Sequence, residues 1–562
     1  MKYILKIKYL IAVLFILPIV NMPQKAYSQI VYEHLSNESI YEFIDEMANL
    51  NYIHINDVIK PYPKQQIYKY LSKIEADVNA GRIKLNKRQS EELSFYLQAY
   101  ILEQPKSILS KKTGKKKVVG KLNPFGLFYK DEEIALGFQP IWGAEAASNK
   151  KGNYSGSYGG ASFYGYVGNQ IGIYGNVRDQ NVSTQLISPD YLTRRPSAPY
   201  KKFGESIDYS EARGGIVYSF KWGHIGFVKD HIQWGTGYNG TNILRGTIPS
   251  FAQIKLNIKP TNWFEFNYYH GSLTSNVVDS LHSYKTNNTY RAVFYSKYIA
   301  ANMFTFYPLK HLNISIGNSI IYTNENGGGP KLTYLIPFLF YKSADLTVSS
   351  NESGGYTSNN NQMFFSISSR NIKHLHLYFS LFADDISVRY FFNSDLYNSF
   401  AYKLGFRLSN FKLQNVSLTM EYTRTNPYVY QHHAQTQDYT TNEYNMGHYL
   451  GGNSQELYVS LRCTPIRGLA FQLSYTFAQK GDDYDINSPI ESIHSDPILK
   501  NIIWEKQNIL FRVNYEILSN THLYGLFSYQ NISGNQEKIQ KFTPEFYWGK
   551  TFTVSGGLNI GF

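Results

Sequence analysis

The chain has 562 residues, of which 43% are hydrophobic, 16% aromatic and only 17% charged, and it contains 50 Tyr and 42 Gly. After its first 28 residues there is no uninterrupted run of about twenty apolar residues, which argues against membrane-spanning helices. Its formal net charge is +13, and its single cysteine, Cys463, excludes an internal disulfide.

The amino terminus has the pattern of an export signal. Lys2, Lys6 and Lys8 precede an apolar run from Tyr9 to Val20, and Ala26 and Ser28 supply the small residues of a cleavage site. We therefore expect residues 1–28 to be a cleaved secretory signal peptide. An exported chain rarely meets nucleic acid, so no nucleic-acid partner is expected.

Residues 29–105 are predicted to form a small periplasmic helical domain. Apolar residues recur at helical spacing in three stretches: Ile40 to Ala48, Pro63 to Val78, and Leu93 to Ile101. Asn86 with Gln89 three residues later fits a capping box at the start of the third helix. The shared apolar stripes indicate a common core for these helices.

Residues 106–133 are interpreted as a basic linker. It holds six closely spaced lysines, namely Lys106, Lys111, Lys112, Lys115, Lys116 and Lys117. Such a run is most often solvated, and the alternative is contact with anionic lipid headgroups or an acidic polymer.

From Ile134 onward the period of the pattern changes to two. In the last eleven residues, large apolar side chains at Phe552, Val554, Leu558, Ile560 and Phe562 alternate with small or polar ones. This is typical of the final strand of an outer-membrane barrel, although a half-buried sandwich strand gives the same alternation. We predict a mainly β chain in which residues 134–562 form a transmembrane antiparallel β-barrel.

The lengths of the connections support that prediction. Counted back from a periplasmic Phe562, short turns such as 519–521 and 465–468 alternate with predicted outer loops such as 479–506, 179–208 and 148–156, as in bacterial barrels. The count gives about 18 strands. Leu332 to Tyr341 is apolar but interrupted by Pro337, so residues 323–362 are expected to pack in or over the barrel mouth.

The segment 226–256 contains the candidate binding residues Lys229, Asp230, Trp234, Tyr238 and Arg245. The glycines of Trp-Gly-Thr-Gly-Tyr permit a tight turn beside two rings that could stack on sugar faces. The cations could then pair with uronic-acid carboxylates. The other interpretation is that Trp234 and the charged pair pack or ion-pair in the lumen and fix the loop. The alternation of turns and loops assigns this segment to the outer face.

No nucleophile-elbow, zinc-helix or phosphate-loop pattern is present. The acidic run Asp482, Asp483 and Asp485 and the histidines His432, His433 and His448 lie in predicted outer loops, where solvated side chains are the commoner case. We therefore expect no enzyme activity, no metal site and no cofactor.

The segment 226–256 resembles the one that marks the capsule-assembly Wzi family of outer-membrane proteins. It has a charged pair, a Trp-Gly-x-Gly step, Leu244, and Pro249 before the next strand. The whole chain also resembles the Bacteroidetes branch of that family, which includes the gliding-motility protein RemB. The Lys229–Asp230 pair departs from the Arg-rich version expected in enterobacterial members.

The resemblance implies an eighteen-stranded barrel with a periplasmic helical bundle, a number that also guided our strand count. It implies a non-catalytic outer-membrane protein that anchors or helps assemble capsular polysaccharide or exopolysaccharide. The expected partners are outer-membrane lipid, acidic surface polysaccharide and surface proteins. Two alternatives remain open. The first is a gliding-motility or adhesion component, and the second is a diffusion porin. We expect the pore to be closed, because the helices and residues 323–362 can plug the lumen.

Overall fold

A computed structural model describes residues 29–104, 119–184, 186–204, 206–287, 289–323, 329–349, 359–385, 398–487 and 495–561. The predicted signal peptide, the cluster of six lysines and the terminal Phe562 lie outside the described residues.

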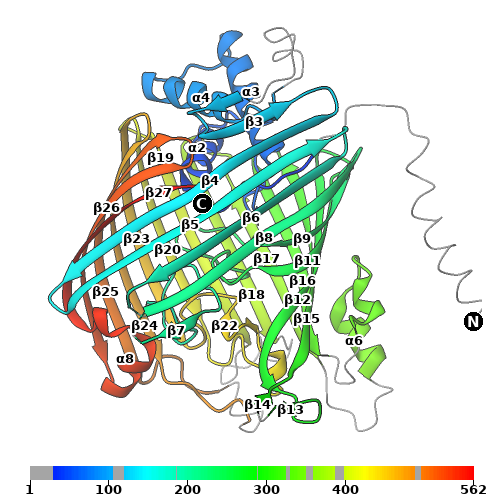
Figure 1. Ribbon diagram of the computed structural model, residues 1–562, viewed down its shortest axis with the longest axis vertical. Helices are drawn as coiled ribbons and strands as arrows, with labels where there is room; N and C mark the ends of the chain where they lie inside the picture. The colour runs from blue at the N-terminus through cyan, green and yellow to red at the C-terminus, as the bar shows by residue number, and fades with distance from the viewer. Residues whose placement is uncertain are drawn as a thin grey trace, which may run out of the picture.

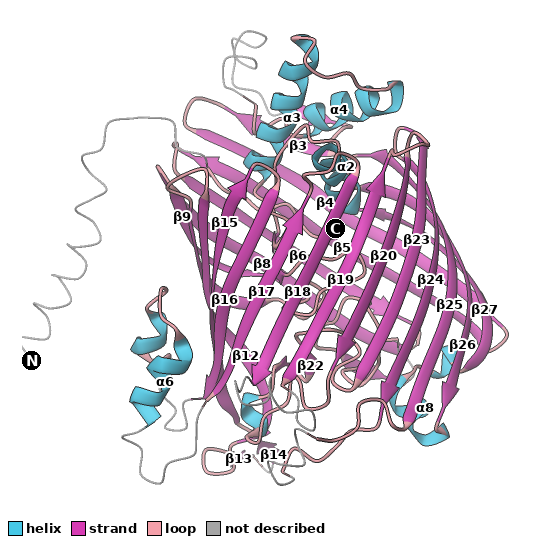
Figure 2. Cartoon of the chain, turned by 180° about the vertical axis from the view of Figure 1, so that it is seen from behind, coloured by secondary structure: helices cyan, strands magenta, loops and turns pink. Residues whose placement is uncertain are grey.

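Within the described residues, eighteen antiparallel strands form a closed barrel, which confirms the predicted fold class (Figures 1 and 2). Strand β27 pairs with β4, with Val554 opposite Ser148, and this pairing closes the sheet. The strands are β4 (Ile134–Asn149), β5 (Gly152–Val167), β6 (Ile171–Val182), β8 (Ser206–Phe220), β9 (Gly223–Asp230), β11 (Phe251–Ile258), β12 (Phe264–Val278), β15 (Phe294–Leu309), β16 (Leu312–Thr323), β17 (Asn360–Ser369), β18 (Leu375–Asp385), β19 (Ser399–Ser409), β20 (Val416–Thr425), β23 (Ser454–Ile466), β24 (Leu469–Gly481), β25 (Ile502–Leu518), β26 (Thr521–Gly534) and β27 (Gly549–Ile560).

The two faces of the wall differ as the alternation predicts. In β27, Phe552 and Val554 are 56% and 41% exposed, whereas Thr551 and Thr553 are buried. The apolar side chains therefore face outward and the polar ones face the lumen, as a barrel in lipid requires. No helix among the described residues is long and apolar enough to cross a membrane.

Short turns gather at one end of the barrel and long loops at the other. The predicted turns at 519–521 and 465–468 are found between β25 and β26 and between β23 and β24. The predicted outer loop 148–156 is instead a two-residue turn, because β4 continues to Asn149 and β5 begins at Gly152. The small elements of the loops are β7 (Lys201–Phe203), β10 (Gln233–Trp234), β13 (Tyr284–Thr286), β14 (Thr289–Arg291), η4 (Gln435–Gln437), β21 (Thr440–Thr441), β22 (Tyr444–Asn445), α8 (Gln536–Phe542) and η5 (Glu545–Tyr547).

Three helices lie at the end of the barrel that carries the short turns (Figure 1). They are α2 (Glu38–Asn49), α3 (Lys64–Asn79) and α4 (Lys87–Ala99), and the two-residue strand β1 (Ile59–Lys60) lies between the first two. Their apolar stripes meet in one core that includes Ile44, Leu71 and Tyr96. The predicted capping box is confirmed, because Asn86 and Gln89 bond to each other's backbone amides.

Part of the predicted linker 106–133 is regular structure. Strands β2 (Val119–Lys121) and β3 (Gly126–Lys130) form a hairpin, and β3 pairs with β4 from Ala135 to Phe138. The hairpin extends the sheet beside the part of β4 that β27 leaves unpaired.

The expectation that residues 323–362 pack in or over the barrel mouth is wrong for the described part of that segment. Here η2 (Leu332–Leu335) and α6 (Tyr341–Ser349) lie against the outside of the wall (Figure 2). Tyr334 and Tyr341 pack on Phe266 and Tyr322, which face away from the lumen. The physical reason is that polar side chains on this patch of wall need partners that lipid lacks.

Candidate functional site

The lumen is filled from both ends. From the short-turn end, α2 and residues 50–63 enter the barrel, and from the other end the loop 231–250 folds inward. The two meet in a small sheet, in which Ile59 of β1 pairs with Trp234 of β10 and Lys60 with Gln233. The plug is therefore one continuous structure built from two distant parts of the chain.

The centre of the plug is apolar. Trp234 is 1% exposed and packs edge-on against Tyr269 and Phe364, with ring centroids 4.9 and 6.4 Å apart. Val58 from the helical domain and Val429 from the loop 426–453 belong to the same cluster. Three inserted segments thus share one hydrophobic core with the inner wall.

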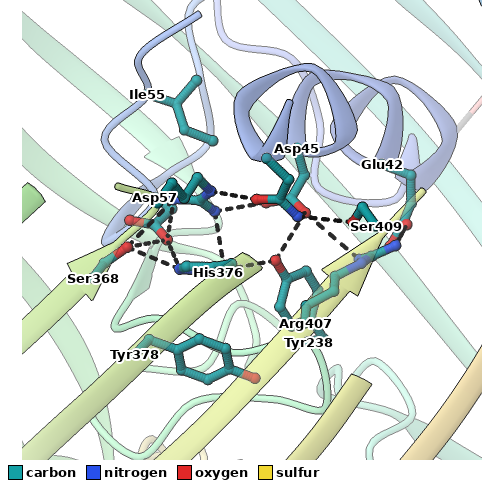
Figure 3. Close-up of polar contacts among 12 residues, drawn as sticks. Glu42, Asp45, Ile55, Asp57, Tyr238, Ser368, His376, Tyr378, Arg407 and Ser409 are labelled. Carbon is teal, nitrogen blue, oxygen red and sulfur yellow. Dashed lines mark hydrogen bonds and ion pairs between the residues drawn. The ribbon is translucent and has the colours of Figure 1, made fainter. Parts of the chain in front are cut away.

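Beside this core a buried polar network fixes α2 to the barrel (Figure 3). Arg370, in the turn between β17 and β18, bonds to Asp45 at 2.7 Å and to Asp57 at 3.0 Å. Asp57 also accepts from Ser368 at 2.8 Å and lies 3.0 Å from His376. We call Asp45, Asp57 and Arg370 the latch.

Tyr238 connects the latch to the inserted loop. Its hydroxyl donates to Asp45 at 2.8 Å, and its ring lies under the Arg407 guanidinium, 4.5 Å from the centroid. The Tyr238 amide donates to Glu421 at 2.6 Å. The loop, the helix and the wall are therefore held by one network.

The acidic partners on α2 are held in their charged form. Burial raises the pKa of Glu42, but Arg407 and Arg462 outweigh it and lower that pKa to about 2. Burial also raises the pKa of Asp45, but the nearby cations Arg370 and Arg407 outweigh it, so this pKa lies below its ordinary value. Ionised carboxylates at neutral pH make these contacts charge-assisted.

A second polar cluster lies inside the wall near the long-loop end and is more open. It consists of Tyr154, Tyr158, Arg178, Arg194 and Arg195, which we call the mouth cluster. Arg178 lies over the ring of Tyr158 at 4.1 Å, and Arg195 donates to the Tyr154 hydroxyl at 2.7 Å. Arg194 lies 6.0 Å from the ring of Tyr458.

The mouth cluster has more positive than negative charge. Glu145 is 3.6 Å from Arg195, and the side chains of the two are 23% and 33% exposed. Guanidinium groups offer paired donors to carboxylates, and tyrosine rings offer flat faces to sugar rings. The arrangement suits an acidic carbohydrate. Within the described part of the chain, no three His, Cys, Asp or Glu side chains gather in a way that could hold a metal ion.

The structure distributes the five predicted binding residues over different surroundings. Lys229 faces outward and bonds to Ala212 O and Ser250 Oγ, both at 2.7 Å. Asp230 faces the lumen and pairs with Arg213 at 2.9 Å, not with Lys229. Its second oxygen accepts from the Tyr174 hydroxyl at 2.7 Å.

Trp234 and Tyr238 belong to the plug, and Arg245 is buried with its Nε 2.8 Å from Asn445 O. The expectation that residues 234–245 lie on the outer face is therefore wrong, because β10 pairs with β1 inside the lumen. The alternative interpretation, in which Trp234 packs in the lumen and fixes the loop, describes its position.

The mouth cluster is not among the sites predicted from the sequence. Tyr154, Tyr158 and Arg178 occupy lumen-facing positions of β5 and β6, and the period of two identifies such positions once the strands are placed. Arg194 and Arg195 lie in the predicted outer loop 179–208. No pattern indicates that this loop folds back against the wall.

Comparisons with known proteins agree with the fold. A family model described as capsule assembly protein Wzi matches residues 216–540. Among solved structures the chain is similar to Wzi of Escherichia coli, described as an outer-membrane protein involved in group 1 capsule assembly and as a carbohydrate-binding β-barrel. That match has a TM-score of 0.56 and 12% identity, and it covers 95% of this chain and 100% of that one.

Two further similar structures are OccD3 (OpdP) of Pseudomonas aeruginosa and OccAB2 of Acinetobacter baumannii. OccD3 gives a TM-score of 0.41 at 11% identity, over 75% of this chain and 90% of that one. OccAB2 gives 0.43 at 10%, over 76% and 98%. No curated protein matches the sequence.

Proposed function

Because the chain belongs to the capsule assembly protein Wzi family, we propose that it is a non-catalytic outer-membrane barrel that anchors or helps assemble acidic capsular polysaccharide or exopolysaccharide at the cell surface. The observation that carries this proposal is the mouth cluster. It places three arginines near the long-loop end, where an outer-membrane barrel meets the exterior, and two tyrosines lie behind them, of which Tyr154 is buried.

The plug supports an anchoring role over transport of the polymer. The lumen contains an apolar core and a buried ionic latch, so a polymer bound at the mouth meets a closed surface. Charge-assisted contacts with repeated carboxylates add up along a polymer, so weak single contacts can hold a long chain. We also propose that the protein belongs to the Bacteroidetes branch of the family, which includes RemB, because its wider arrangement, with helices first and then the barrel, resembles that branch.

The proposal is tested by binding of an acidic polysaccharide to the purified full-length protein in detergent. We expect the double variant Arg178→Gln/Arg195→Gln to lose about 100-fold in affinity, since each lost charged hydrogen bond is worth about 1.5–3 kcal/mol. Arg291→Gln is the matched control, because Arg291 lies exposed on β14 outside the lumen. Unchanged binding by the double variant would exclude the mouth cluster as the binding surface.

A deletion strain tests the role in the cell. The cell-bound fraction of surface polysaccharide should fall and the released fraction should rise. If all polysaccharide stays cell-bound, anchoring is excluded. Loss of surface spreading with normal capsule would select the alternative of a gliding-motility component.

A further inference from the structure

A cavity of about 130 Å³ lies at the opposite end of the barrel from the mouth cluster. It is enclosed by residues 56–70 of the helical domain, by Trp234 of the inserted loop, and by the inner wall at Lys255. Strand β11 ends at Ile258 beside a short turn, which places the cavity at the periplasmic end. Gln66 and Tyr70 at its edge are partly exposed, so it can be reached from that side.

Three residues of the lining carry unused hydrogen-bonding groups. Trp234 Nε1, Tyr62 Oη and Asn56 Nδ2 are buried and have no partner among the described residues. Tyr62 is 7% exposed, and Trp234 is almost fully buried. Buried polar groups are nearly always paired, so three unpaired groups around one cavity indicate a missing partner. All three can donate, which suits a ligand rich in acceptor oxygens.

The cavity also contains an uncompensated positive charge. Lys255 is 8% exposed, and its Nζ lies 4.0 Å from the ring centroid of Tyr32. Among the described residues no carboxylate lies within ion-pair distance of it. The nearby Glu265 is engaged by Lys259 at 3.3 Å and by the Tyr307 hydroxyl at 2.7 Å. A buried ammonium that contacts an aromatic ring but has no ion pair favours an anion beside it.

The size and the walls restrict the anion. A water needs roughly 10–15 Å³ of such space, so the cavity has room for about ten waters, which is comparable to one six-membered sugar ring. The aromatic side chains of Tyr32, Tyr62, Tyr70 and Trp234 contribute to the lining. A small inorganic anion would leave these ring surfaces and most of the donors without contact.

We propose that this cavity binds a single hexuronate residue, that is, a pyranose ring bearing a carboxylate, with the carboxylate directed toward Lys255. The choice of a sugar acid over another acid rests on the proposed function, whereas the site itself is separate from the mouth cluster. Because its walls come from both the helical domain and the barrel, the bound sugar also stabilises the docking of the two.

The test is calorimetric titration of the full-length protein in detergent with D-glucuronate and D-galacturonate. D-glucose, acetate and inorganic phosphate are the comparison ligands. We expect Lys255→Met to weaken uronate binding about tenfold or more, and Tyr62→Phe, which removes only a hydroxyl, to weaken it about threefold. Lys285→Met and Tyr284→Phe are the matched controls, since both residues are exposed on β13.

Retention of uronate binding in Arg178→Gln/Arg195→Gln supports a site apart from the mouth. The proposal is overturned if the wild type does not bind uronate, or if acetate or phosphate binds as tightly as uronate. It is also overturned if the mouth variant loses uronate binding and Lys255→Met keeps it. Tyr62→Phe keeps the test decisive if Lys255→Met fails to fold. The two proposals fail separately, because the cell-bound polysaccharide assay decides the function and the free-sugar titration decides the cavity.

Discussion

At the scale of single residues, several barrel arginines pair with α2, and two of them lie in contrasting surroundings. Arg370 is buried between Asp45 and Asp57, whereas Arg512 pairs at 2.9 Å with Glu38, whose side chain is 60% exposed. Removing one partner of a buried pair leaves the other charge without compensation, while an exposed pair contributes little. The latch, and not the outer pair, should therefore control docking.

We accordingly predict that Arg370→Met destabilises the docked helical domain by about 3–5 kcal/mol. Arg512→Met, the matched control, should cost less than about 1 kcal/mol. Protection of residues 29–104 from a protease in detergent measures the difference. Equal protection in the two variants would show that the latch does not hold the domain.

The sequence predicts which way a strand residue faces better than it predicts long-range contacts such as those of the latch. The period of two correctly places Phe552 and Val554 on the outer face, because facing depends only on neighbours along the strand. The contact between Asp45 and Arg370 joins residues 325 positions apart. It depends on how a helix docks into a closed barrel, and no local pattern encodes that.

At the scale of elements, α2 is the part of the plug whose attachment to the barrel depends on ionised carboxylates. The pKa of Glu42 falls from 4.5 to about 2 on folding, and that of Asp45 also falls. A carboxyl group with a depressed pKa contributes stability above its unfolded pKa and loses it as the pH falls through the folded value.

The contribution of Glu42 and Asp45 to docking should therefore be constant from pH 7 to about 5 and weaken between about pH 4.5 and 2. Protease protection of residues 29–104 across this range measures it. Glu42→Gln removes one titrating group and should reduce the change between the two ends of the range. An acid-induced loss of protection that is as large in Glu42→Gln as in the wild type would contradict this assignment.

The segment 329–349 lies on the outside of the wall, whereas the sequence led us to expect it in or over the barrel mouth. Asn302 and Asn318 face outward from β15 and β16, and Asn302 Nδ2 donates to Pro337 O at 3.0 Å and Leu339 O at 2.8 Å. The Tyr341 amide donates to Asn318 Oδ1 at 2.9 Å. The apolar stretch and Pro337 were recognised in the sequence, but their role as a cover for two amides on the outer wall depends on strand register.

Replacing residues 330–349 by a short Gly/Ser linker should lower the free energy of unfolding by about 2–4 kcal/mol. Both amides then lose their partners in that segment and face lipid, and of their side-chain bonds among the described residues only that from Asn318 Nδ2 to Asn302 Oδ1 remains. Adding Asn302→Leu and Asn318→Leu to that deletion should restore most of the loss. Urea unfolding in lipid vesicles compares the three proteins. If the leucines give no rescue, the segment stabilises the barrel by some other means.

At the scale of the whole molecule, the barrel wall could be predicted far better than its contents. Alternation and the lengths of turns and loops predict a barrel wall in which each strand pairs with its neighbour in sequence, and the family resemblance helped to set the count at eighteen. The contents combine α2, residues 50–63 and the loops 231–250 and 426–453, which are far apart in the sequence and contact one another inside the lumen. The sequence shows that these segments exist, but not that the lumen is where they pack.

This filling of the lumen predicts the electrical behaviour of the protein. An eighteen-stranded wall without a plug encloses an aqueous channel, whereas here Trp234, Val58 and Val429 belong to an apolar core inside the lumen. We expect the wild type to be silent in a planar bilayer at neutral pH.

A variant lacking both residues 29–104 and the loop 231–250 should conduct, because both halves of the β1–β10 sheet are then absent. Deleting the β13–β14 hairpin, which lies outside the lumen, should leave the barrel silent. Steady open-pore conductance by the wild type would instead favour a diffusion porin and remove the argument for a closed anchor.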